Sequence, residues 1–94
     1  MERQKGKMIE LNPIQTSILR SLTFPEPFGT LLEEVSESQP VIGAELKSLI
    51  DKGLVQVVEE DSRGRYQPSI FHDSDNMFAF HYQISSQGLS HLGA

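Results

Sequence analysis

The stretch QPVIGAELKSLIDKGLVQVV, residues 39–58, decides the fold. Pro40 stands in the first turn of a predicted helix, where its missing N–H breaks no hydrogen bond. Gly53 is placed to end that helix in a left-handed conformation, so the helix is predicted over about 40–52. Its apolar residues recur at helical spacing and are expected to face the core; they are Ile42, Leu46, Leu49 and Ile50. The segment LVQVVEE, residues 54–60, alternates and is rich in valine, which predicts a strand.

An earlier helix is predicted over about 13–22, within LNPIQTSILRSL, residues 11–22. Asn12 stands at its cap position, and Pro13 at the first helical position. The apolar residues on one face of this helix are Ile14, Ile18, Leu19 and Leu22. The segment TFPEPF, residues 23–28, ends the helix, because its two prolines cannot continue it.

A short second helix is expected within FGTLLEEVSES, residues 28–38. Its apolar residues at helical spacing are Phe28, Leu31, Leu32 and Val35. The acidic residues of the segment point away from that face; they are Glu33, Glu34 and Glu37. We expect Phe24 and Phe28, beside the two prolines, to fill the core between the first two helices.

Residues 61–76, DSRGRYQPSIFHDSDN, are dense in turn-forming residues and predict a long loop. The aromatic segment MFAFHYQIS, residues 77–85, predicts a second strand that pairs with the first as a hairpin. Ile70 and Phe71 are hard to bury in so small a domain, so we expect them to fold back as a third strand or to form a contact patch. A final helical turn is predicted within SQGLSHLGA.

The composition favours one small globular domain. The chain has 94 residues, of which 37% are hydrophobic, and we expect a single domain over residues 9–94 after a flexible basic tail, residues 1–8. The absence of cysteine excludes disulfides, thiolate zinc sites and cysteine nucleophiles. The apolar runs are too short for a membrane span or a secretory signal, so we expect a cytoplasmic protein with no membrane partner.

Three helices followed by a hairpin are the elements of a winged helix-turn-helix, an α+β fold with three helices and a two- or three-stranded β-wing. Residues 46–58, LKSLIDKGLVQVV, resemble the MarR-like and ArsR-like bacterial regulators, in which two spaced leucines precede a polar pair, Gly-Leu and a valine-rich strand. Residues 82–92, YQISSQGLSHL, resemble the segment that leaves the wing of those proteins. The resemblance covers residues 11–92 and implies a small DNA-binding transcriptional regulator, or its detached domain.

The resemblance implies that the exposed face of the third helix and the wing contact duplex DNA. Three groups of residues are the candidates: Gln39 and Lys47 on the helix, Arg63 and Arg65 in the wing, and Arg3, Lys5 and Lys7 in the tail. Residues 9–62 hold ten acidic and three basic residues, a net charge of −7, which repels phosphates. Val41, Gly43 and Ala44 also offer bases little to hydrogen-bond. We therefore expect the wing and the tail to supply most of any DNA contact.

A second hypothesis is a protein-interaction module that kept the fold and no longer binds nucleic acid. Its candidate contact residues are Glu33, Glu34 and Glu37 of the second helix, and Ile70 and Phe71 of the long wing. A homodimer is a further expectation.

No catalytic, metal or cofactor site is predicted. The segment FHDSDNMFAFH begins like a calcium-binding loop, but Phe78 and Ile84 stand where that loop needs glycine and glutamate. A metal- or ligand-responsive site built on His72 and His81 is the weakest hypothesis, since those side chains would have to converge across the wing. No nucleophile motif or phosphate-binding glycine loop occurs, so we expect no enzyme.

Overall fold

The computed structural model describes residues 10–70, 72–73 and 75–93, and within them the chain is a mixed α+β fold, as predicted. The helices are α1 (Pro13–Ser21), α2 (Phe28–Glu34), α3 (Gln39–Asp51) and α4 (Ser86–Gly93), with a 3₁₀ helix, η1 (Met77–Ala79). The strands are β1 (Glu26–Pro27), β2 (Val55–Glu60), β3 (Tyr66–Pro68) and β4 (His81–Ile84). The predicted basic tail, residues 1–8, lies outside the described residues.

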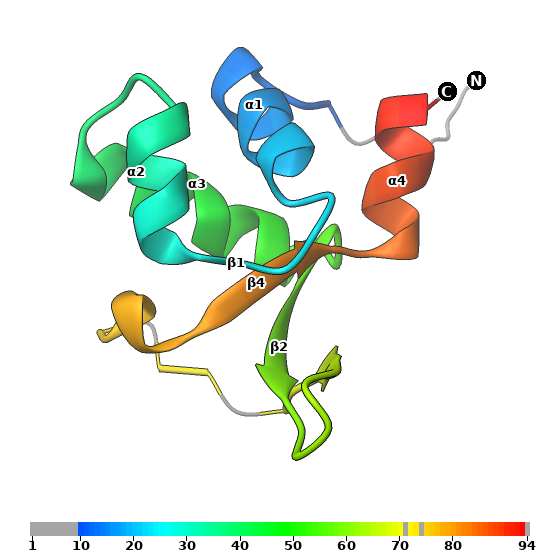
Figure 1. Cartoon of the computed structure of the whole chain (residues 1–94). Helices are drawn as coiled ribbons and strands as arrows, with labels where there is room; N and C mark the ends of the chain where they lie inside the picture. The colour runs from blue at the N-terminus through cyan, green and yellow to red at the C-terminus, as the bar shows by residue number, and fades with distance from the viewer. Residues whose placement is uncertain (1–9, 71, 74, 94) are drawn as a thin grey trace.

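The described strands form one antiparallel sheet in the order β1-β4-β2-β3. Figure 1 shows the helices gathered on one side of this sheet, while the β2–β3 hairpin projects away from them. The core lies between helices and sheet, where the predicted apolar faces meet. The largest fully buried side chains are Tyr82, Phe28, Ile18, Leu19, Leu22, Leu31, Ile42, Leu46, Leu49 and Leu54.

Local sequence signals set the helix ends as predicted. Asn12 and Gln15 form a reciprocal cap at the start of α1, in which each side chain accepts a hydrogen bond from the other residue's backbone N–H. Gly53 follows α3 with a φ of 77°, a conformation that glycine adopts without strain. The Glu45 carboxylate then joins α3 to this cap, because it accepts hydrogen bonds from the Gln15 amide at 2.9 Å and the Asn12 amide at 3.2 Å.

Two strand predictions were wrong in part. The predicted strand over 77–85 begins only at His81, because Met77–Ala79 form a 3₁₀ turn. The third strand is Tyr66–Pro68, inside the predicted 61–76 loop. Of the two alternatives for Ile70, the strand was therefore wrong, and the contact patch stays a prediction. Ile70 is fully exposed, with a relative exposure of 108%, and Phe71 lies outside the described residues.

Phe24 and Phe28 were both predicted to fill the core, and only Phe28 does so. Phe28 is buried at 2% exposure, but Phe24 is 71% exposed and does not fill the core. Between them, Glu26 and Pro27 form the short strand β1 against β4, which the sequence analysis did not anticipate. The physical reason is local: Phe28 starts α2 on its inward face, whereas Phe24 stands in the turn before β1.

The start of α4 is fixed by two small residues. The Ser85 hydroxyl donates to the Gly53 carbonyl at 2.6 Å and accepts from the Gly88 backbone N–H at 3.1 Å. Gly88 lies close to the turn between α3 and β2. A Cβ on Gly88 would collide with the Leu54 carbonyl oxygen of that turn and come within 2.6 Å of Ile84 Cγ1. The end of the sheet and α4 are therefore in direct backbone contact.

Both described edge strands contain a proline, Pro27 in β1 and Pro68 in β3. In β3 the backbone groups that pair with β2 belong to alternate residues, because the Ser69 N–H donates to Val57 and the Arg65 carbonyl accepts from Asp61. Pro68 lies between them, so its nitrogen faces away from β2.

Candidate functional site

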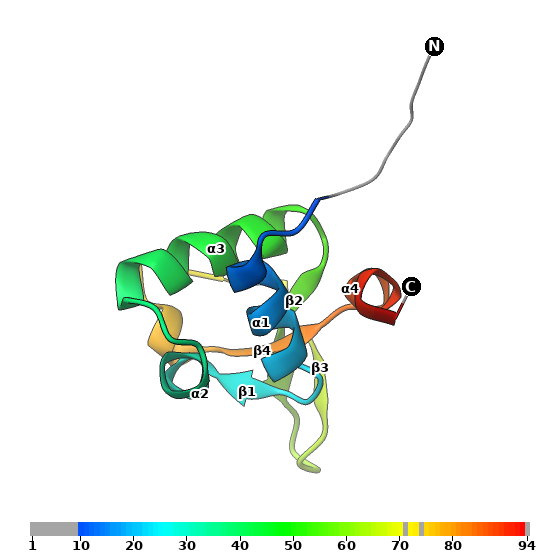
Figure 2. The ribbon, with the colours of Figure 1, turned by 90° about the horizontal axis from the view of Figure 1, so that it is seen from above.

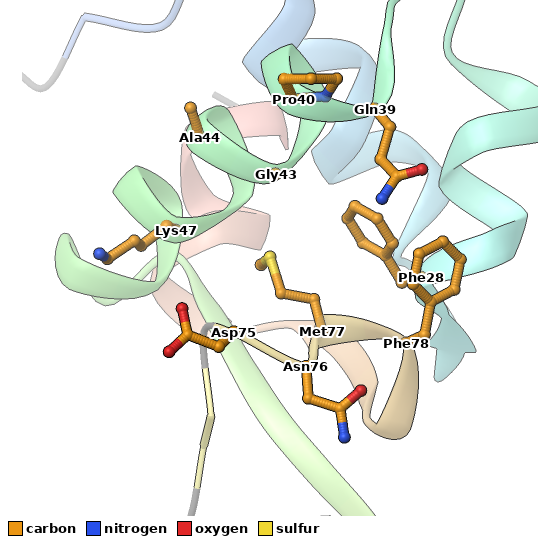
Figure 3. A pocket seen from close by; sticks show the side chains of 10 residues that line it. All are labelled: Phe28, Gln39, Pro40, Gly43, Ala44, Lys47, Asp75, Asn76, Met77 and Phe78. Carbon is orange, nitrogen blue, oxygen red and sulfur yellow. The ribbon is translucent and has the colours of Figure 1, made fainter.

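A groove lies between the exposed face of α3 and the 3₁₀ helix η1 (Figure 3). Its volume is about 390 Å³, within the range of ordinary ligand pockets. The lining residues are Phe28, Gln39, Pro40, Gly43, Ala44, Lys47, Asp75, Asn76, Met77 and Phe78. Gln39 and Lys47, two of the residues predicted from sequence, therefore line the groove opposite residues 75–78. That segment was predicted as the end of a loop and the start of a strand.

The wall opposite α3 is apolar and firmly placed. The ring of Phe78 meets that of Phe28 edge to face, with 4.9 Å between centroids and an interplanar angle of 87°. Phe78 nevertheless remains 53% exposed. Beside it, the Met77 side chain reaches up toward Gly43 (Figure 3). An apolar side chain entering the groove would therefore find an aromatic edge and a thioether.

Tyr82 of β4 connects η1 to the sheet through a hydrogen bond. Its hydroxyl donates to the Met77 carbonyl at 2.9 Å and lies 3.3 Å from His72 Nε2. Burial raises the pKa of Tyr82, so the hydroxyl keeps its proton and remains a donor at neutral pH. Because that single proton goes to Met77, a hydrogen bond in the second contact requires the tautomer of His72 that carries its proton on Nε2.

Gly43 lines the groove on the side formed by α3. A Cβ at this position would lie 3.5 Å from Met77 Sδ and 3.9 Å from Phe28 Cζ, both ordinary van der Waals contacts. The fold therefore has room for alanine, which in a helix interior is more stable than glycine by roughly 0.5–1 kcal/mol. No contact of the described residues therefore requires a glycine at this position.

Polar groups stand at the two ends of the groove. The Gln39 amide lies at the end of the groove near the Phe28 ring, and Asp75 lies at the other end, below Lys47 in the view of Figure 3. The Lys47 side chain extends away from Met77, so its aliphatic stem lines the groove while its amine faces solvent. Asp75 is fixed by its turn, because the Asp73 carboxylate accepts its backbone N–H at 3.0 Å.

Arg63 and Arg65, the predicted wing residues, are exposed on the β2–β3 turn. One Asp61 carboxylate oxygen orders this turn by accepting the backbone N–H of Arg63 at 2.8 Å and of Arg65 at 2.9 Å. Figures 1 and 2 both show the turn projecting away from α3. The structure therefore does not bring the arginines together with Gln39 and Lys47, and Arg3, Lys5 and Lys7 lie outside the described residues.

The predicted partner-binding residues occupy other surfaces. Glu33, Glu34 and Glu37 are all exposed, and the last two line a separate hollow of about 280 Å³ against α1. Ile70 lines another hollow, of about 420 Å³, beside β2. Neither hollow contains residues of the α3 groove.

His72 and His81 both contact aromatic rings. His72 meets Phe80 and Tyr82 edge to face, and His81 packs against Tyr66 at a centroid distance of 5.3 Å. Across residues 10–70, 72–73 and 75–93, no three His, Asp or Glu side chains gather as a metal site would require. In the same residues no helix is both long and apolar enough to cross a membrane.

Comparison of the chain with protein-family models, with curated proteins and with solved structures finds no match. The function is therefore inferred from the groove. Its apolar wall, Met77 and Phe78, was not among the predicted site residues, because both residues were assigned to a strand. The available signal was their excess: two large apolar residues follow directly after a polar loop.

Proposed function

We propose that the chain is a winged-helix domain that acts as a protein-interaction module. The order α1-β1-α2-α3-β2-β4, with β4 between β1 and β2, supports the winged-helix assignment. The short connection between α2 and α3 supports it as well, since these two helices would form the helix-turn-helix.

The observation that carries the proposed function is the groove on the exposed face of α3. In a DNA-reading domain this face enters the major groove and presents donors and acceptors to base edges. Here η1 covers part of the same face with Met77 and Phe78. A hollow with an apolar wall and polar ends beside a helix suits a protein side chain better than a base edge.

The charge of the domain supports the same choice. The described residues contain twelve acidic and five basic side chains, a net charge of −7. Such a body repels a phosphate backbone, whose neutralisation by lysine and arginine supplies most non-specific DNA affinity. A protein partner carries no such requirement.

Site-specific photo-crosslinking tests the proposed function. A photoreactive benzoylphenylalanine at Ala44, which is exposed on α3, should give a discrete protein adduct in cells that produce the chain. The same probe at Ser90, exposed on α4, serves as the matched control and should not give that adduct. Failure to form any adduct at Ala44, or the same adduct from both positions, would contradict the proposal.

DNA binding through the β2–β3 turn is the second candidate function, and the observation that favours it is the ordered presentation of Arg63 and Arg65 by Asp61. Under this candidate, duplex affinity should fall steeply as salt rises from about 50 to 200 mM. Replacing both arginines with alanine should weaken binding, while Lys52→Ala, at the exposed end of α3, should not. No detectable binding at low salt would eliminate this candidate.

A further inference from the structure

We propose that the α3 groove takes a short basic peptide segment of a partner protein, with one large apolar side chain seated on the Met77–Phe78 wall beside Gly43. This inference rests on the proposed function and specifies its partner. Three features of the molecule support it: the apolar seat formed by Met77 and Phe78, the charge of the domain and the length of the groove.

The seat is built to accept one apolar side chain. Met77 contributes a flexible, polarizable thioether that adapts to different shapes, and Phe78 presents a half-exposed ring fixed by its contact with Phe28. Gly43 carries no side chain, and the flexible Met77 thioether covers its backbone, because a Cβ at this position would lie 3.5 Å from Met77 Sδ. The entering group replaces that thioether against the backbone of α3. A buried apolar anchor in a small pocket is the usual centre of a peptide-binding site.

The charge of the domain as a whole favours a cationic flank on the peptide, since the groove lining itself holds one anion, Asp75, and one cation, Lys47. Asp75 stands at one end of the groove on a turn that Asp73 orders, and both residues are exposed. Lys47 is the cation among the groove residues, and its amine is directed away from the apolar wall. The net charge of −7 on the described residues would also steer a basic segment toward the domain and an acidic one away.

The length of the groove limits the bound segment. It follows α3 from Gln39 to Lys47, a separation of eight positions, which at a rise of 1.5 Å per residue is about 12 Å. An extended peptide covers that distance with about four residues. The expected motif is therefore one large apolar residue with lysine or arginine within about three positions.

Selection from a displayed library of random nonapeptides, with the whole chain as bait, tests the inference. Enriched peptides should contain the expected motif, and synthetic copies should bind the chain in solution. Gly43→Leu should weaken their binding by at least about tenfold, because the new side chain occupies the seat. Asp75→Asn should weaken it by roughly two- to fivefold and flatten its salt dependence, as expected for an exposed charge pair.

Two variants separate occupation of the seat from loss of the fold. Gly43→Ala adds a methyl group with ordinary contacts, so it should keep or raise Tm while still reducing peptide affinity. Gly29→Ala lies in α2 with no atom within 4 Å of the added carbon, and it should leave peptide affinity unchanged.

The inference is overturned by the absence of any enriched peptide, by enrichment of acidic peptides, or by equal binding to the wild-type chain and Gly43→Leu. A concentration-dependent dimer in sedimentation that Gly43→Leu abolishes would also overturn it, because a second copy would then occupy the groove. If Ala44 forms a protein adduct but no basic peptide binds, the partner class is wrong and the proposed function stands. If the adduct is absent as well, both fail.

Discussion

Replacing Gly88 with alanine should lower the free energy of unfolding by about 3 kcal/mol, at the upper end of the cost of inserting a methyl group into a packed site. The added carbon would collide with the Leu54 carbonyl oxygen and press on Ile84, and backbone cannot move aside as a flexible side chain can. Relieving the collision would shift α4 and strain the Ser85 cap beneath it. Denaturant unfolding should show the loss, with Tm lower by more than about 10 °C.

Gly29→Ala is the matched control for this substitution. It introduces the same methyl group into a helix where nothing lies within 4 Å, so it should leave stability unchanged or raise it by roughly 0.5 kcal/mol. If Gly88→Ala unfolds at the same denaturant concentration as Gly29→Ala, the close approach of α4 to Leu54 is not present in solution.

Replacing Glu45 with alanine should cost about 2 kcal/mol. The carboxylate accepts hydrogen bonds from both amides of the α1 cap, and Gln15 is only 4% exposed. Its removal leaves the buried Gln15 amide without this acceptor, and a buried donor without a partner costs about 1–3 kcal/mol. Hydrogen exchange should accordingly rise in α1 before the rest of the domain.

Glu33→Ala provides the comparison, because it removes an equal charge from an exposed position on α2. Its effect on the free energy of unfolding should stay within about 0.5 kcal/mol. Glu45→Gln should recover part of the loss, since its remaining carbonyl oxygen can still accept one bond. Equal losses for the Glu33 and Glu45 variants would mean that the carboxylate does not couple α1 to α3.

The helix ends were predictable because their causes are local. Asn12 and Pro13 act on the turn that follows them, and Gly53 acts on its own backbone angle, so each signal is complete within a few residues. The apolar spacing of α3 likewise placed Ile42 and its neighbours inside. Short strands carry weaker signals, which is why β1, with two residues, was not anticipated.

The candidate site was less predictable because its contacts join distant parts of the chain. Phe78 meets Phe28 across fifty residues, and Met77 lies against Gly43 across thirty-four. Read alone, the run of residues 77–80 contains enough aromatic side chains to suggest a continuous strand. The contacts with α2 and α3 turn it into a 3₁₀ helix instead, and tertiary packing of this kind overrides local preference.

The prolines of the edge strands bear on how the domain behaves when crowded. Another chain can pair with the exposed edge of a strand and continue the sheet. Fully exposed Ile70, which follows β3, would add an apolar contact to such pairing. The nitrogen of Pro68 faces outward and carries no hydrogen, so the row of backbone donors along the outer edge of β3 is interrupted at Pro68. The hairpin is thereby protected against aggregation, and recruitment of a partner is left to side chains.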